Sequence, residues 1–203
     1  MNNRNDYPTI EKTFVMIKPD GVARSLVGKI FQRLEEQGLK LIAARMITAK
    51  EAQISIHYPG NNKKWLKGVG EKTIRNYNNN KSVIEDFGND NPLEIGKIVY
   101  KNMSKYLCKG PIIISVWEGN HAVERVRKLA GATVPTFSEV GTIRDSYAFD
   151  TPQLAIRSRR IVFKNLIHIS DSVDEAQREI SIWFKDKYKP LNKYERVDYI
   201  DIL

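Results

Sequence analysis

The chain has 203 residues, 41% of them hydrophobic and 28% charged, which is the composition of a globular domain; no charge-free apolar stretch approaches the roughly 18 residues of a membrane span. The first ten residues lack the apolar block of a signal peptide, and the single cysteine, Cys108, cannot form a disulfide within the chain, so we expect a soluble protein of the reducing cytoplasm. The net charge of +9 favours a polyanionic partner such as nucleic acid, a nucleotide or acidic lipid.

The first part of the chain predicts a strand, a helix and a second strand. "TFVMIKP", which begins at Thr13, is a β-branched and aromatic run that Pro19 ends, as it would end a strand. Apolar residues then recur at helical spacing from Val27 to Leu34, and Gly38 follows where a left-handed C-terminal cap is expected. "LKLIAARMI" predicts the second strand, and "AKEAQISIHY" predicts a short helix.

The next stretch changes character. Residues 61–97 are rich in Asn, Gly and Lys and show no sustained helical period, although "IGKIVYKNMSKYL" can resume a helix. We therefore expect an elaborated excursion with some helical turns, not a second domain.

The second half predicts two more strands and two helices. "PIIISVW", from Pro111, is the clearest buried strand, and an amphipathic helix follows it and stops at Gly131. After the long loop "ATVPTFSEVGTIRDSY", "RIVFKNLIHI" predicts the last strand, whose length allows an irregular lead-in. Ser172 and Glu175 then form an S-x-x-E capping box. The apolar positions of the helix that follows are Val173, Ala176, Ile180, Trp183 and Phe184.

This order of elements predicts the fold. Strand, helix, strand, helical excursion, strand, helix, strand, helix is the ferredoxin-like split βαβ order with extra helices. We expect an α/β sandwich built on a four-stranded antiparallel sheet that is open on one face, and a single domain over residues 1–203.

His168 is the candidate nucleophile. It lies at the end of a predicted strand, and its ordinary pKa of about 6.5 leaves much of the imidazole unprotonated near neutral pH. Ser170 and Glu179 lie close in sequence and can orient the ring. A lone histidine between apolar residues is nevertheless more often a satisfied core residue, so His168 alone favours packing.

Cations from elsewhere change that balance. Lys18 ends the first strand, Arg127 lies late in the helix after the third strand, and Arg144 stands in "GTIRD". With the hydroxyl of Thr133 they would form a phosphate clamp around His168, because guanidinium forks and a lysine charge match phosphate oxygens. Taken one by one, each cation is an ordinary surface residue.

Four blocks together resemble one family. "KTFVMIKPDGVARSLVGKI" is similar to the opening motif of nucleoside diphosphate kinases, and "KNLIHISDSVDEAQREISIWF" to their active-site histidine motif. "GPIIISVWEGNHAVERVRKLAGAT" and "GTIRD" lie between them in the family order. The resemblance runs from about Glu11 to the C-terminus and is specific because the blocks occur jointly.

The resemblance implies a ping-pong reaction in which the γ-phosphoryl group of a nucleoside triphosphate moves to His168 and then to a nucleoside diphosphate. It also implies that Ser170 and Glu179 orient the histidine and that Tyr58 lies near its phosphate pocket. The residues that match the phosphate- and sugar-binding positions are Lys18, Arg127, Thr133, Arg144 and Asn165.

The cofactor and partners follow from the same resemblance. Asp171 corresponds to an acidic residue close to Mg²⁺, with water between them, and the nucleotide phosphates hold most of the ion's ligands. The family implies a homo-oligomer, with a hexamer favoured over a tetramer or a dimer.

Several positions depart from the family pattern. Trp65 in "NNKKWLKG" is the expected base-stacking aromatic, but an alternative alignment places Val99 or Tyr100 there. Asp145 and Ser146 follow the arginine of "GTIRD" where Gly-Asp is usual, and Ile169 follows His168 where a glycine is usual. Compared with a short family member, the chain carries insertions at about residues 67–104 and 146–163.

Two other interpretations stay open. The ferredoxin-like order and the basic charge also suit a nucleic-acid-binding module, but such modules need several aromatics on the middle strands; "PIIISVW" is essentially aliphatic and "TFVMIKP" offers only Phe14. The lysines of residues 63–75 are most simply a solvated face, so nucleic-acid binding is at most secondary. A catalytically inactive relative is the second alternative. His57 and His121 are expected at the surface.

Overall fold

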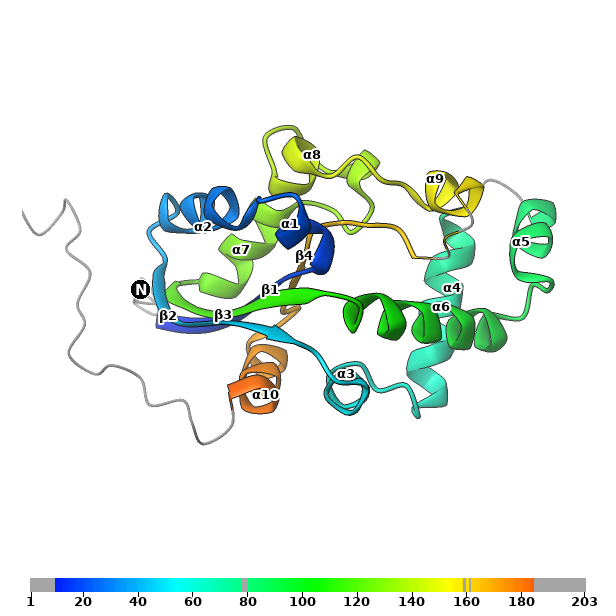
Figure 1. The fold of residues 1–203 in the computed structure, drawn as a ribbon, viewed down its shortest axis with the longest axis horizontal. Helices are drawn as coiled ribbons and strands as arrows, with labels where there is room; N and C mark the ends of the chain where they lie inside the picture. Colours follow the sequence, from blue (N-terminus) through cyan, green and yellow to red (C-terminus); the bar gives the residue numbers. More distant parts are fainter. Residues whose placement is uncertain (1–9, 78–79, 159, 161, 185–203) are drawn as a thin grey trace, which may run out of the picture.

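The computed structural model describes residues 10–77, 80–158, 160 and 162–184, and its centre is one four-stranded antiparallel sheet. The strands lie in the order β2-β3-β1-β4 (Figure 1). Their bounds are β1 Ile10–Ile17, β2 Lys40–Thr48, β3 Pro111–Asn120 and β4 Ile167–Ile169. This is the ferredoxin-like arrangement that the order of elements predicts.

Helices cover both faces of the sheet, so the prediction of an open face is wrong. On one face, β1 residues such as Val15 pack with α2 (Val27–Glu35) and α7 (Ala122–Ala130). On the other, Phe14 and its alternating neighbours pack with α3 (Glu51–His57) and α10 (Val173–Phe184). Because strand side chains alternate between the two faces, a strand as apolar as β1 requires a cover on each side.

The excursion is more regular than its sequence indicates. It contains α4 (Lys63–Arg75), α5 (Asn80–Phe87) and α6 (Pro92–Leu107), and α4 and α6 pack against each other. Asn62 and Asn91 accept hydrogen bonds from the first-turn amides of α4 and α6. The helical period is interrupted because glycines, Gly70 and Gly96, stand at the closest contacts of the two helices.

We expect Gly96→Ala to destabilise the fold by about 1–3 kcal/mol, because a Cβ at Gly96 would lie 1.9 Å from the carbonyl oxygen of Leu66 in α4. Urea unfolding would measure the loss. Gly68→Ala is the matched control, since a Cβ there has nothing within 4 Å, and helix propensity predicts a gain of up to about 1 kcal/mol. Equal stability of the two variants would contradict the close crossing of α4 and α6.

The last strand is shorter than predicted. Between β3 and β4 lie α7, the 3₁₀ turn η1 (Pro135–Phe137), α8 (Ile143–Tyr147) and α9 (Pro152–Arg157). β4 then covers only Ile167–Ile169, because Leu166 has φ 69° and turns the chain out of line with the sheet. The amide of Leu166 donates to the carboxylate of Asp20 in α1 (Pro19–Ala23), and the carbonyl of Leu166 accepts from the amide of Lys18.

Three further expectations can be compared with the structure. Gly38 has φ 74° and lies beyond the end of α2, as predicted for a left-handed cap, and α7 ends at the residue before Gly131, as predicted. The amide of Glu175 donates to Ser172 Oγ, as in a capping box, but the Glu175 carboxylate pairs with Arg178. Among the described residues, no helix is long and apolar enough to cross a membrane.

The prediction that the chain begins without a signal peptide rests on the first ten residues. Nine of them lie outside the described ranges, which begin at Ile10.

Candidate active site

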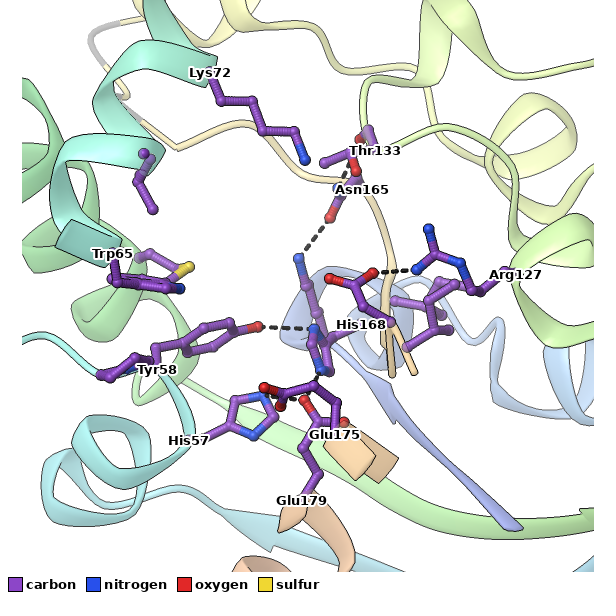
Figure 2. Close-up of a pocket in the computed structure, with 18 of the residues that line it drawn as sticks. His57, Tyr58, Trp65, Lys72, Arg127, Thr133, Asn165, His168, Glu175 and Glu179 are labelled. Atoms are coloured by element: carbon purple, nitrogen blue, oxygen red, sulfur yellow. Dashed lines mark hydrogen bonds and ion pairs between the residues drawn. The ribbon is translucent and has the colours of Figure 1, made fainter. Parts of the chain in front are cut away.

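A cavity of about 880 Å³ opens beside His168 (Figure 2). Segments far apart in the chain line it: the end of β1, α4, α7, the loop after α7, α8, β4 and α10. Every site residue that the sequence predicts lines this cavity except Ser170, which lies behind His168 and is 1% exposed. The fold therefore brings the predicted residues together.

His168 is held through both of its ring nitrogens. Nε2 lies 2.6 Å from Glu179 Oε1, and Nδ1 lies 3.1 Å from the hydroxyl of Tyr58. Ser170 Oγ donates to the other oxygen of Glu179 at 2.6 Å. A carboxylate can only accept, so Nε2 carries the proton and Nδ1 keeps a lone pair, to which Tyr58 donates.

Strand register explains why His168 faces α10. His168 pairs with Met16 of β1, and its neighbour Ile169 pairs with Val15. Because side chains alternate, Ile169 packs into the core on the α2 and α7 face while His168 lies on the face that α10 covers. The residue that replaces the usual glycine is thus a core residue.

Burial sets the protonation of His168 and of the two groups that bond its ring, Tyr58 and Glu179. It lowers the pKa of His168 well below the ordinary value, and the positive charges of Lys18 and Arg144 add to this effect. Burial also raises the pKa of Tyr58 and that of Glu179. At neutral pH His168 is therefore an uncharged imidazole, and the hydroxyl of Tyr58 keeps its proton.

Lys18 and Asn165 form a polar pair in the wall of the cavity. Lys18 Nζ donates to Asn165 Oδ1 at 2.6 Å, and Asn165 Nδ2 donates to the carbonyl of Thr133 at 2.8 Å. Burial lowers the pKa of Lys18 to about 8, with Arg144 as the next cause. Across the cavity, Arg127 pairs with Asp171. An incoming phosphate therefore meets cations on two sides.

Arg144 differs from a freely presented phosphate fork. It is 5% exposed, and its guanidinium donates to three backbone carbonyls, those of Gly131, Asn165 and Ile167. Because a guanidinium has five N–H groups, part of its donor capacity still faces the cavity. Arg144 thus joins the end of α7 to the turn before β4. Its neighbour Asp145 accepts from the amide of Gly141 and stabilises the same loop.

The prediction that His57 lies at the surface is wrong. His57 is 1% exposed, and its ring centroid lies 4.5 Å from that of His168. It follows Ile54 by three residues in α3, so both project from one helix face, and this spacing is a signal that the sequence carries. The prediction for His121 is confirmed, since its side chain is 54% exposed.

α4 contributes one side of the cavity. Trp65 and Lys72, two turns apart on α4, both face the cavity (Figure 2). The ring of Tyr100 packs edge-on against that of Trp65, with 6.2 Å between the ring centroids, and Val99 packs against the hydrophobic cluster around Ile95. Neither residue lines the cavity. Lys64 and Lys72 are exposed, as the interpretation of residues 63–75 as a solvated face predicts, and both also line the cavity.

Comparison with known proteins gives consistent matches. A family model described as nucleoside diphosphate kinase matches residues 11–69 and 72–188. The nucleoside diphosphate kinase of Pyrobaculum aerophilum is 44% identical over 179 residues, which cover 88% of this chain and 97% of the relative. Nucleoside diphosphate kinase 3 of Danio rerio is 36% identical over 176 residues, which cover 87% and 78%.

Solved structures agree with these sequence matches. A crystal structure of an NDP kinase from Pyrobaculum aerophilum has a TM-score of 0.81 at 41% identity and covers 88% of this chain and 98% of its own. A structure from Borrelia burgdorferi, described as a transition state mimic with bound vanadate and ADP, has a TM-score of 0.70 at 30% identity, with 95% and 96% covered.

Proposed function

The chain belongs to the nucleoside diphosphate kinase family, and on that premise we propose that it carries the γ-phosphoryl group from a nucleoside triphosphate to a nucleoside diphosphate on His168. The observation that carries this proposal is the state of the His168 ring. Glu179 holds the proton on Nε2, and Nδ1 keeps its lone pair at a cavity lined by cations.

The geometry supports a two-step transfer. The Nδ1 lone pair attacks the γ-phosphorus, the N–P bond forms, and the bond from phosphorus to the bridging oxygen breaks, its electron pair leaving with the nucleoside diphosphate. The ring gains positive charge because Nε2 keeps its proton, and the Glu179 carboxylate at 2.6 Å stabilises that charge. A second nucleoside diphosphate then attacks the phosphohistidine by the reverse route.

Each remaining residue has a place in this scheme. Lys18 and Arg127 offset negative charge on the transferred group, and the hydroxyls of Thr133 and Tyr58 donate to its oxygens. Asn165, bonded to Lys18, offers its amide to the sugar. Arg144 fixes the turn before β4 and adds positive charge to the cavity.

Mg²⁺ fits this site as an ion held mainly by the nucleotide. Asp171 has a side chain that is 82% exposed, and one of its oxygens pairs with Arg127, so it offers a single carboxylate to the ion or to its water. When bound, Mg²⁺ would neutralise charge on the nucleotide phosphates. Asp171 would position the hydrated ion.

The phosphotransfer assay tests the proposed function. Incubation with γ-labelled ATP and Mg²⁺ should give a phosphoprotein that is labile in acid and stable in base, and the label should pass to added GDP or UDP. An acid-stable ester would refute a phosphohistidine. A catalytically inactive relative would bind nucleotide without taking label, and a nucleic-acid-binding module would retain only its affinity for polyanions.

We expect Trp65→Ala to raise the KM for nucleotide by up to about tenfold, because a lost base–aromatic stack costs about 1–2 kcal/mol. Trp65→Phe, which keeps a stacking ring, is the matched control and should restore most of the affinity. Steady-state kinetics with ATP and GTP would measure both variants. An unchanged KM in Trp65→Ala would return the base-stacking role to Val99 or Tyr100.

The pKa of Lys18 predicts that activity falls at alkaline pH. Its pKa in the free enzyme is about 8, and only the charged ammonium attracts phosphate, so kcat/KM should fall as the pH rises above about 8. Measuring kcat/KM between about pH 6.5 and 9.5 would detect this alkaline decline. Lys18→Arg should lower the rate but abolish the decline, because a guanidinium stays charged over the whole range. A flat wild-type profile would contradict the assignment.

Three broader features complete the proposal. We propose one domain over residues 1–203, with insertions at about residues 67–104 and 146–163. The half-buried Cys108 supports a place in a reducing cytoplasm. A homo-oligomer, with a hexamer favoured over a tetramer or a dimer, rests on the family alone, and light scattering would give its mass.

A further inference from the structure

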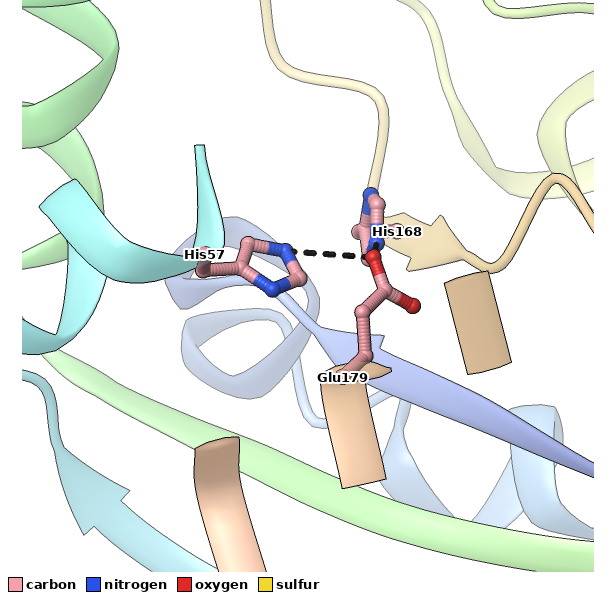
Figure 3. A group of neighbouring side chains, drawn as sticks. All are labelled: His57, His168 and Glu179. Atoms are coloured by element: carbon pink, nitrogen blue, oxygen red, sulfur yellow. Dashed lines mark hydrogen bonds and ion pairs between the residues drawn. The ribbon is translucent and has the colours of Figure 1, made fainter. Parts of the chain in front are cut away.

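His57 has a buried nitrogen without a hydrogen bond. Among the described residues, its Nε2 has no hydrogen-bond partner, although His57 is 1% exposed. The facing atom is Glu179 Oε1 at 3.7 Å, the same oxygen that holds His168 (Figure 3). A buried polar atom left in this way is costly, so its position calls for a reason.

Trp183 decides which nitrogen of His57 carries the proton. The indole N–H of Trp183 lies 3.1 Å from His57 Nδ1, and an indole can only donate. Nδ1 is therefore the acceptor. Because burial lowers the pKa of His57 well below its ordinary value, the ring is neutral and its single proton is on Nε2. That N–H faces the carboxylate of Glu179.

Two side chains of α10 hold His57, one at its backbone and one at its ring. Arg178 donates to the backbone carbonyls of Ile56 and His57, at 3.0 and 2.9 Å, while Trp183 bonds the ring. Arg178 and Glu179 are adjacent on α10 and Trp183 lies about one turn further along, so the helix that supplies the carboxylate also fixes the histidine beside it.

A metal ion is a weaker explanation of the same three groups. His57, His168 and Glu179 each offer a ligand atom, and these atoms lie within 4.8 Å of one another. A metal ligand needs a lone pair on Nε2, but the Trp183 bond places the proton of His57 there. His168 likewise uses its Nε2 proton to bond Glu179.

We propose that His57 is a positioning residue for phosphotransfer: Trp183 fixes its tautomer, and the resulting Nε2–H faces Glu179 and keeps that carboxylate aimed at His168. The inference rests on the proposed function of His168. As the ring of His168 becomes positive during transfer, the neutral His57 adds no repulsive charge at 4.5 Å. Its N–H also opposes rotation of the carboxylate away from Nε2 of His168.

Histidine-selective ¹⁵N NMR on the full chain tests the tautomer without turnover. The chain has only three histidines, and the spectrum of His57→Gln assigns one of them. We expect Nδ1 of His57 to be unprotonated and Nε2 to carry hydrogen in the resting enzyme. The opposite tautomer would overturn the proposal. Failure of His168 to take label would instead refute the proposed function, so the two failures are distinguishable.

Kinetics of variants test the positioning role. His57→Phe keeps a ring but loses the N–H dipole that faces the Glu179 carboxylate, and it should lower kcat by about tenfold or more, with KM changed less than about twofold. His57→Gln can place an amide N–H near the same point and should recover most of the rate. Equal losses in both variants, or full activity in His57→Phe, would overturn the proposal. His121→Gln, at the exposed histidine, is the matched control.

Discussion

His168→Asn should reduce phosphotransfer by at least about 10⁴-fold, to the detection limit, because it removes the only group placed to form the covalent intermediate in the proposed scheme. Asparagine has no nucleophilic nitrogen at neutral pH. Labelled ATP should leave no acid-labile phosphate on this variant, and the transfer from ATP to GDP should stop. These two measurements report the two half-reactions.

The fold should survive this substitution. His168 lies on a short strand whose backbone pairing with β1 does not depend on the side chain. Circular dichroism and nucleotide binding should therefore match those of the wild type, since the cations and Trp65 remain. His121→Asn controls for the loss of any histidine and should retain full activity. Turnover by His168→Asn would refute the nucleophile and leave the residue as a packing histidine.

Local patterns predicted much of the fold. β1 and β3 are apolar runs, and α7 is an amphipathic helix with a glycine end, so short stretches of sequence contain the whole signal. The capped start of α10 is equally local. In contrast, the cover on the second sheet face was not predicted, because it depends on where α3 and α10 pack after folding.

The candidate site likewise has features that the sequence predicted and features that it did not. Its positions were found because four motifs lie in the family order, and the structure brings those residues to one cavity. His57 was misplaced because its burial depends on Trp183 and Arg178, which lie more than 100 residues away in sequence. Arg144 was expected to be a phosphate fork, but its three carbonyl partners are backbone atoms, which no side-chain pattern reveals.

Lys72 shows a related limit. Charge in an Asn- and Lys-rich segment favours solvent, and the sequence has no means of showing that α4 turns one face to the cavity. That face becomes visible only when the close contact of Gly70 and Gly96 with the neighbouring helix sets the position of α4 against α6. α4 thus contributes to the cavity wall.

Glu179→Gln should lower kcat by about a hundredfold, because it keeps an acceptor for His168 Nε2–H but removes the negative charge that stabilises the developing positive ring. The loss should appear in the rate of phosphorylation, with little change in nucleotide KM. Single-turnover kinetics with labelled ATP would measure it. A variant that phosphorylates at the wild-type rate would show that the charge of Glu179 is unnecessary.

The same substitution should make the protein more stable at pH 7.5. Burial raises the folded-state pKa of Glu179 above its unfolded value, so the folded protein binds the proton more tightly than the unfolded chain does. Stability therefore falls as the pH rises from the unfolded pKa through the folded pKa, and above that range the ionised carboxylate costs stability. Glutamine removes this cost, and thermal unfolding at pH 7.5 should show a higher Tm.

Asp174→Asn is the matched control, because it removes one exposed negative charge from the first turn of the same helix. It should leave kcat unchanged and lower stability slightly, since an acidic residue near a helix N-terminus is favourable by about 0.3–1 kcal/mol. Opposite signs for the two variants would show that Glu179 is retained for its effect on His168 at a cost to the stability of the fold. A lower Tm in Glu179→Gln would mean instead that the carboxylate stabilises the folded chain.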